Sequence, residues 1–185
     1  MHVPVRVRPA AAAVTVAAVA LVAPPAPVGA HTAETPDSVA APTLKDPKVV
    51  GEACKGSTGI TVVVDFRKLH NEAGKVMNRV KIGCAKGAQA DGFEALLDAG
   101  FDVDPTVEFV CEIDERPLPE DSICASNGYW AYSHGERGGD WTYSGVGPAD
   151  WVPPAGSLEG WSWAPYDKVG WDLPRVTPSD LFPAL

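Results

Sequence analysis

The sequence of this 185-residue chain predicts an α+β domain in which one helix packs on a mostly antiparallel sheet of six or seven short strands. Three observations predict it. A β-branched segment near residue 60 alternates in polarity, a single segment near residue 92 has the signals of a capped helix, and the last third holds several short aromatic segments separated by glycine. The order is therefore two strands, one helix and further strands.

The first expected strand is Ile60-Thr61-Val62-Val63-Val64-Asp65-Phe66, whose apolar residues recur at every second position. Such alternation is typical of a strand with one buried face. Residues 76–83 are its expected hairpin partner, because residues 71–74 read Asn-Glu-Ala-Gly, which is turn chemistry.

A helix is expected next. Asp91 and Glu94 have the spacing of a capping box, and Gly100 stands where a helix of this length ends. The apolar residues that share one face of this helix are Phe93, Leu96 and Leu97. This is the one helix that we expect in the mature chain.

The remaining strands are expected at residues 107–113, 129–133, 140–144 and 158–163. Residues 135–139, Gly-Glu-Arg-Gly-Gly, are expected to form a hairpin tip. The folded domain should therefore cover residues 53–165.

The two ends of the chain should differ from this domain. Arg6 and Arg8 precede an apolar run from Ala10 to Ala23, and small residues lead up to Ala30, which together predict a signal peptide at 1–30. Residues 31–52 are rich in Ala, Pro and Thr and are expected to form a flexible linker. The prolines at 165, 174, 178 and 183 argue against a regular element in the tail, residues 166–185.

The negative charge of the chain limits the kinds of partner that it can bind. The chain has 15 Lys and Arg against 24 Asp and Glu, and removal of Arg6 and Arg8 with the signal peptide leaves 13 against 24, a formal charge of about −11. Such a charge repels nucleic acid. No second apolar run of membrane length follows, so we expect a secreted mature chain without membrane insertion.

Four cysteines form an even set, which in an exported chain indicates disulfides. Three pairings are possible. Cys54 and Cys84 flank the expected hairpin, and Cys111 and Cys124 enclose a proline-rich loop, so the simplest geometry joins each cysteine to its neighbour. The chain contains no Cys-x-x-Cys pair, and we expect neither a metal site nor a cofactor.

The strongest functional signal is aromatic, because all six tryptophans lie in the last third of the chain. Such rings serve either as a stacking platform for a ring-bearing ligand or as a compact core beneath the helix. The candidate ligand-binding residues are Trp130, Tyr132, His134, Trp141, Tyr143 and Trp151. We expect Trp151 to be the most exposed of the tryptophans, since prolines follow it closely.

Catalysis is not expected. Ser133, His134 and Asp140 supply the residue types of a serine-hydrolase triad, but they lie too close in sequence to reach its geometry. The Gly-x-Ser-x-Gly turn of many such enzymes is also missing. The chain is therefore expected not to be an enzyme.

Several of these segments resemble the transcobalamin-like C-terminal domain family, namely Gly59–Phe66, Gly92–Phe101, Phe109–Asp114, Tyr129–Tyr132, Trp141–Ser144 and Glu159–Trp163. The resemblance implies a β-grasp-like fold, known from secreted bacterial proteins and from the smaller domain of vertebrate cobalamin carriers. Two departures stand out. Ser133 occupies a position where the family often has a further tryptophan, and the large helical domain of the carriers has no counterpart here.

The leading expectation is thus an exported, non-catalytic module that binds a ligand, with cobalamin or a related corrinoid as the candidate. An envelope-associated protein-interaction or structural module is the alternative. A secreted protease inhibitor is a third reading, because the loop between Cys111 and Cys124 contains Arg116-Pro117-Leu118-Pro119.

Overall fold

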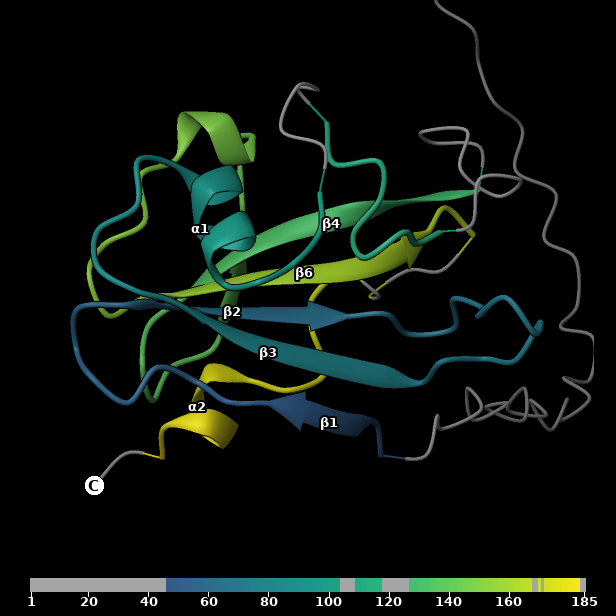
Figure 1. Ribbon diagram of the computed structural model, residues 1–185, viewed down its shortest axis with the longest axis horizontal. Coiled ribbons are helices and arrows are strands. Elements are labelled where there is room, and N and C mark those ends of the chain that lie inside the picture. The colour runs from purple at the N-terminus through teal and green to yellow at the C-terminus, as the bar shows by residue number, and fades with distance from the viewer. Residues whose placement is uncertain (1–45, 104–108, 118–126, 168–169, 171, 184–185) are drawn as a thin grey trace, which may run out of the picture. The chain divides into compact units, whose positions relative to one another are not determined.

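A six-stranded sheet with a helix on one face is the centre of the protein, as the computed structural model shows for residues 46–103, 109–117, 127–167, 170 and 172–183 (Figure 1). The strands are β1 (Lys48–Gly51), β2 (Ile60–Asp65), β3 (Arg79–Ala85), β4 (Gly128–Gly135), β5 (Trp141–Tyr143) and β6 (Leu158–Pro165). The helices are α1 (Gly92–Asp98), the single 3-10 turn η1 (Pro148–Asp150) and α2 (Pro178–Leu181). The predicted α+β class is confirmed.

The strand order is β1-β3-β2-β6-β4-β5. Hairpins β2–β3 and β4–β5 are antiparallel, as is the β4–β6 pair. The pairs β1–β3 and β2–β6 are parallel, so the sheet is mixed. In the central parallel pair Thr61 lies opposite Leu158, which brings the two ends of the domain together.

Helix α1 forms where the capping signals predict it. The Asp91 side chain accepts a hydrogen bond from the Glu94 N–H at 2.8 Å, and the Glu94 carboxylate accepts one from the Ala90 N–H. The first contact satisfies an N–H group in the first turn that has no intrahelical partner, and the second ties the residue before the cap to the helix. The helix ends before Gly100, which has φ +89°, a conformation that glycine adopts without steric cost.

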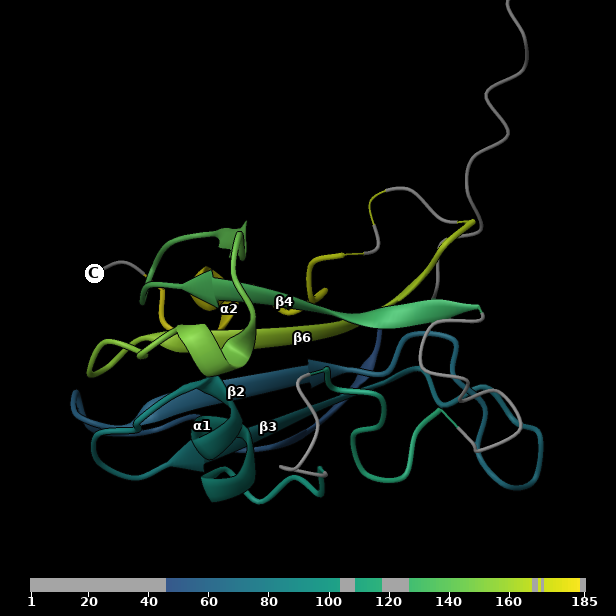
Figure 2. The ribbon, with the colours of Figure 1, turned by 90° about the horizontal axis from the view of Figure 1, so that it is seen from above.

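The face of the sheet beneath α1 holds the larger core, and Figure 2 shows the helix lying against β2 and β3 on this side. The side chains that alternate along β2, β4 and β6 supply it. Its fully or nearly buried strand residues include Ile60, Val62, Val64, Trp130, Tyr132, Trp161 and Trp163. Four of the clustered aromatic rings are therefore core, which is the alternative that the sequence left open.

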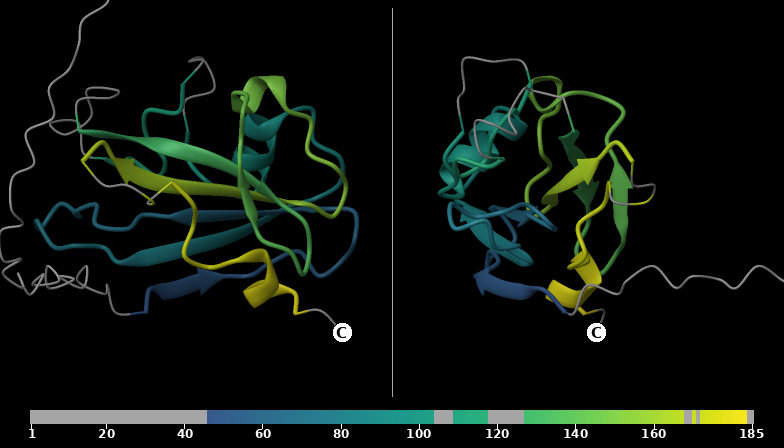
Figure 3. Two further views of the ribbon diagram at one scale, coloured as in Figure 1. Left: turned by 180° about the vertical axis from the view of Figure 1, so that it is seen from behind. Right: turned by 90° about the vertical axis from the view of Figure 1, so that its right-hand side faces the viewer.

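The opposite face is covered by the C-terminal segment, which crosses behind the strands and ends in α2 (Figure 3). A second cluster forms here from Val63, Val80, Ile82, Trp141, Leu158 and Val176, with Leu173, Leu181 and Phe182 packed against it. The expectation that residues 166–185 form no regular element is wrong. Pro178 stands in the first turn of α2, where proline is tolerated, and Thr177 and Asp180 form a capping box.

A buried ion cluster fixes this segment to the sheet. The Asp65 side chain at the end of β2 is fully buried and accepts hydrogen bonds from the backbone N–H, Nε and Nη2 of Arg175, at 2.9, 2.9 and 2.7 Å. Arg67 lies 3.6 Å from the same carboxylate, and its Nε donates to Ser162 Oγ. Burial lowers the pKa of Arg67 from its usual value, while Asp65 opposes that effect.

Two further expectations need correction. The end of the expected linker at 31–52 forms β1, because Lys48–Gly51 pairs in parallel with β3. The expected strand at 107–113 is absent over its described part, 109–113, apart from one bridge between Ile113 and Arg116. Asp114 and Glu115 have φ +52° and +58°, so the chain turns back at the point where a strand would continue.

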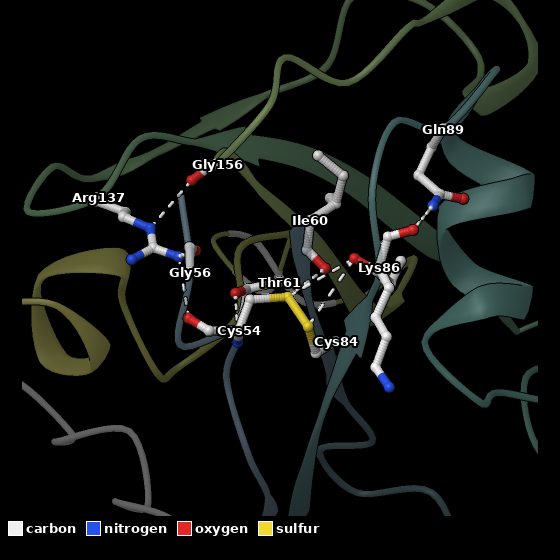
Figure 4. The surroundings of a disulfide bond; sticks show 10 residues. Cys54, Gly56, Ile60, Thr61, Cys84, Lys86, Gln89, Arg137 and Gly156 are labelled. Atoms are coloured by element: carbon white, nitrogen blue, oxygen red, sulfur yellow. Dashed lines mark hydrogen bonds between the residues drawn. A yellow bond between two sulfur atoms is a disulfide. The ribbon is translucent and has the colours of Figure 1, made fainter. Parts of the chain in front are cut away.

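The disulfide Cys54–Cys84 is confirmed and lies beside Ile60 and Thr61 (Figure 4). Arg137, from the β4–β5 hairpin, stabilises the segment around the disulfide. It donates hydrogen bonds to the carbonyls of Cys54, at 2.9 Å, and Gly156, at 3.2 Å. The second expected pair includes Cys124, which lies outside the described residues, so the pairing of Cys111 with Cys124 stays a prediction.

Close packing between β3 and α1 depends on Gly83. A Cβ at this position would lie 2.2 Å from the carbonyl oxygen of Ala99, a backbone atom. Gly83→Ala is therefore expected to lower the free energy of unfolding by about 1–3 kcal/mol, because α1 must shift. Chemical denaturation would measure it. Gly56→Ala is the control, because a Cβ at Gly56 would meet open space, so this variant should change stability much less. Gly87 is not a suitable position for a control, because its φ of +80° would strain any other residue.

No described helix is long and apolar enough to cross a membrane.

Candidate functional site

The six candidate ligand-binding residues fall into three groups in the structure. Trp130, Tyr132 and Trp141 are buried, with 5%, 6% and 8% of their surface exposed. His134 and Trp151 are half-buried. Tyr143 alone is clearly exposed, at 48%. The rings of Trp130, Tyr132 and Trp141 are therefore not displayed as a stacking platform.

The buried members have internal partners. Trp130 packs edge-on against Phe66 and Trp163, and its Nε1–H donates to the Arg116 carbonyl at 3.1 Å. Trp141 lies on the other face of the sheet, where its Nε1–H donates to the Val176 carbonyl at 2.9 Å. Both indoles are positioned by the fold and present no free ring face.

A polar network surrounds the carboxylate of Glu159, which is fully buried on β6. Its Oε1 accepts a hydrogen bond from Trp151 Nε1–H at 3.2 Å. Its Oε2 accepts from the Tyr132 hydroxyl and lies 3.2 Å from His134 Nδ1. Three groups from two other segments thus converge on one carboxylate, which satisfies it in the core.

The rings of this network pack on one another. The imidazole of His134 is stacked on the indole of Trp151, with centroids 4.0 Å apart, and meets Tyr132 edge-on at 4.8 Å. Trp151 is therefore held against the domain instead of being displayed. Burial, together with the Glu159 carboxylate, raises the pKa of Tyr132 far above its ordinary value, so its phenol remains a hydrogen-bond donor.

Ser144 completes the network on the far side of His134. Its Oγ lies 2.7 Å from His134 Nε2 and also 2.7 Å from the Val146 carbonyl, and it accepts from the Val146 N–H at 3.2 Å. Ser144, His134 and Glu159 follow one another in the order of a hydrolase triad. Ser144 is only 6% exposed, so its hydroxyl faces the interior of the domain.

Ser133, His134 and Asp140 do not form a triad, as their close spacing in the sequence predicted. Ser133 Oγ donates instead to the Gly160 carbonyl at 3.1 Å. The sequence analysis missed Ser144 and Glu159 as the partners of His134. Strand alternation could have indicated Glu159, because it shares the inward face of β6 with Trp161 and Trp163, where a carboxylate needs partners.

Exposed aromatic side chains gather at a different place, which we call the tyrosine surface: Tyr129, Tyr143 and Tyr166, with 36%, 48% and 57% of their surface exposed. The rings of Tyr129 and Tyr166 are stacked with centroids 5.7 Å apart and planes inclined by 23°. Tyr143 lies opposite Ser133 on the neighbouring strand, so it shares a sheet face with Tyr129. The sequence analysis named only Tyr143 of these three.

Tyr129, at the centre of the tyrosine surface, is uncharged at neutral pH. Burial, followed by a hydrogen bond with Tyr143, raises the pKa of Tyr129 to about 12. Asp172 contributes to the same shift, which places a negative charge near this ring. Neutral phenols offer both a ring face and a hydroxyl, which suits a ligand that is part ring and part polar.

The loop that suggested a protease inhibitor does not present its basic residue. The side chain of Arg116 is only 11% exposed and forms an ion pair with Glu72, with 3.7 Å between Nη2 and Oε1. Leu118 and Pro119 lie outside the described residues. An inhibitor of this kind displays its contact side chain to the protease, and Arg116 is turned inward.

No cluster of three or more His, Cys, Asp or Glu side chains suited to a metal ion occurs among the residues that the structure describes. A hollow of about 380 Å³ lies beside the disulfide, and its lining includes Cys54, Cys84, Lys55 and Lys86. It contains none of the candidate residues.

Comparison of the chain with family models, with curated proteins and with solved structures finds no match.

Proposed function

We propose that the chain is an exported binding module that holds a ring-bearing ligand on the tyrosine surface, with cobalamin or a related corrinoid as the first ligand to test. The observation that carries the proposal is the exposed tyrosine pair Tyr129 and Tyr166, stacked side by side next to Tyr143. Three phenols on one side of a rigid sheet offer contact area at little cost in side-chain entropy. Export is supported by the disulfide Cys54–Cys84, which is typical of oxidising compartments.

We propose further that the fold is β-grasp-like. In support, α1 crosses a sheet whose central pair, β2 and β6, is parallel and is flanked by β3 on one side and β4 on the other. The resemblance of Gly92–Phe101 and Glu159–Trp163 to the transcobalamin-like family agrees with this arrangement. Strand β1 is then an addition at the outer edge of β3.

A single face of exposed rings limits affinity. One side of a flat ligand stays in solvent, so we expect a dissociation constant of about 1 µM or weaker, which corresponds to roughly 8 kcal/mol of binding free energy. A second protein that covers the other side would raise the affinity. We expect the ligand to bind through ring stacking and through contacts with the tyrosine hydroxyls. No charged group of the protein should be neutralised on binding.

Isothermal titration of the full chain with cyanocobalamin tests the proposal. Tyr143→Ala is expected to weaken binding about 10-fold, since one aromatic contact is worth roughly 0.5–1.5 kcal/mol beyond its buried area. Val152→Ala is the matched control, because Val152 is 67% exposed but lies outside the tyrosine surface. Absence of heat at saturating cyanocobalamin and cobinamide would refute a corrinoid as the ligand. An equal effect of Tyr143→Ala and Val152→Ala would refute the tyrosine surface as the binding site.

An envelope-associated protein-interaction module is the second candidate, and one observation favours it. Strand β5 is three residues long and ends the strand order, so Tyr143 stands at an edge of the sheet where another chain could dock. A photo-crosslinking amino acid at position 143 should then give a discrete adduct on intact cells. The same probe at Val49, on the opposite edge, is the control.

A further inference from the structure

We infer that His134, Ser144 and Glu159 form a partly buried proton-binding site, in which the hydrogen bonds of the Ser144 hydroxyl change with the protonation of His134 and so affect the loop that carries Trp151. The inference does not depend on the ligand proposed above. It follows from counting the hydrogen atoms that the observed contacts require.

The contacts of Glu159 fix the position of the first hydrogen atom. Tyr132 O–H and Trp151 N–H both donate to this carboxylate, and the third group facing it is His134 Nδ1, 3.2 Å from Oε2. A carboxylate with two donors in place accepts from the third, so Nδ1 carries a hydrogen. This fixes the tautomer of the neutral ring, whose Nε2 is then free of hydrogen and must accept.

Ser144 has one hydroxyl hydrogen and two acceptors at the same distance, His134 Nε2 and the Val146 carbonyl, each 2.7 Å from Oγ. When His134 is neutral, the hydroxyl donates to Nε2. When the ring gains a proton on Nε2, that N–H donates to Oγ and the hydroxyl turns to the Val146 carbonyl. Because the Val146 N–H already donates to Oγ, the protonated state gives Ser144 one donated and two accepted bonds, its full capacity.

The protonated state therefore satisfies each of these groups with the observed heavy-atom positions, whereas the neutral state leaves the Val146 carbonyl without the Ser144 hydrogen. A buried imidazole that could gain a proton only by leaving a donor without an acceptor would lose roughly 1–3 kcal/mol. Here the rotation of one hydroxyl avoids that loss. The proton enters a site where Glu159 supplies the counter-charge and the Trp151 ring, 4.0 Å away, stacks on the imidazolium.

The surroundings hold few other charges. On β4 the titratable neighbour is Tyr132, and on β6 it is Glu159. Helix α1 contributes Asp91, whose charge reaches Tyr132, and the loop contributes the exposed Asp150 beside Trp151. Strand β5 faces His134 with Thr142 and contributes no charge there.

The consequence is a loop with two states. With a neutral His134, Ser144 is tied to Val146 by one hydrogen bond, from the Val146 N–H. With a protonated His134, a second bond to the Val146 carbonyl forms, and the stacked cation holds Trp151 more firmly. The segment between Ser144 and Trp151 is thus held more tightly at acidic than at alkaline pH.

Nitrogen-15 NMR of the full chain between pH 5 and 8 tests this, since histidine is the side chain that ordinarily changes charge in that range. At the alkaline end His134 should carry its hydrogen on Nδ1, and the Val146 amide signal should move with the same midpoint as the His134 ring. In Ser144→Ala the Val146 amide should stop following the ring, and Ser144→Thr should restore the response. His70, which is exposed, is the reference ring, and His70→Gln should leave the Val146 response unchanged.

Three results would overturn the inference: a hydrogen on Nε2 of the neutral ring, a Val146 signal independent of the ring in the wild type, or a response that persists in Ser144→Ala. The first two are read from the wild-type chain, so the test remains decisive if the serine variants fail to fold.

Discussion

Asp65→Ala is expected to lower the free energy of unfolding by about 3–5 kcal/mol, the usual result of removing one partner from a buried ion pair. The Asp65 side chain is fully buried and receives three hydrogen bonds from Arg175 and one from the Arg67 backbone N–H at 3.0 Å. Without this carboxylate, the guanidinium groups of Arg67 and Arg175 would lose the acidic partner that they share. Such a loss is a large part of the stability of a domain of this size.

Denaturation in urea, followed by tryptophan fluorescence, would measure the effect. Glu52→Gln is the control, because Glu52 and Lys55 form an ion pair whose side chains are 80% and 89% exposed. It should leave the midpoint unchanged. A midpoint for Asp65→Ala within experimental error of the wild type would mean that the cluster contributes nothing net, as some buried ion pairs do.

Removal of the Cys54–Cys84 disulfide is expected to cost roughly 3–4 kcal/mol, because it closes a loop with a sequence separation of 30 residues. The chain-entropy model assigns the effect to the unfolded state, which gains freedom once the crosslink is gone. The double variant Cys54→Ala/Cys84→Ala avoids a free thiol. Its thermal unfolding should begin well below that of the wild type.

A control separates the crosslink from local packing. Gly59 lies against the sulfurs, since a Cβ there would meet Cys54 Sγ at 2.8 Å, so the site is crowded and the alanines leave a small cavity. Wild-type protein treated with reductant keeps both sulfurs but loses the bond, and the double variant is treated in the same way so that the loss of any other disulfide affects both samples equally. If reduced wild type and the double variant unfold at the same temperature, the loss comes from the crosslink. An unaltered unfolding temperature in both would contradict the prediction.

Elements with strong local signals were predicted well. Helix α1 has its cap at Asp91 and its end before Gly100, and alternating residues placed β2, while glycine-bounded aromatic segments placed β4, β5 and β6. These features depend on neighbours in sequence. Trp161 and Trp163, two positions apart on β6, point to the same core, as strand alternation requires.

Other features depend on distant residues and could not be predicted. Lys48–Gly51 becomes a strand only because β3 offers a free edge, and Pro178–Leu181 becomes a helix in a segment fixed by the contact of Arg175 with Asp65. The candidate site shows the same limit. The number of aromatic residues was informative, but whether a ring is core or surface depends on which face α1 and the C-terminal segment cover. Tyr129 and Tyr166 were missed for this reason.

The parallel pairing of β2 with β6 has a consequence for how the chain reaches its folded state. Residues near 61 lie beside residues near 158, and Asp65 binds Arg175, 110 positions later. The centre of the sheet is therefore incomplete until nearly the last residue is available, and contacts so distant in sequence form slowly. During synthesis from the N-terminus, the first half of the sheet must therefore wait with one edge of β2 unpaired until residues 158–165 have been made.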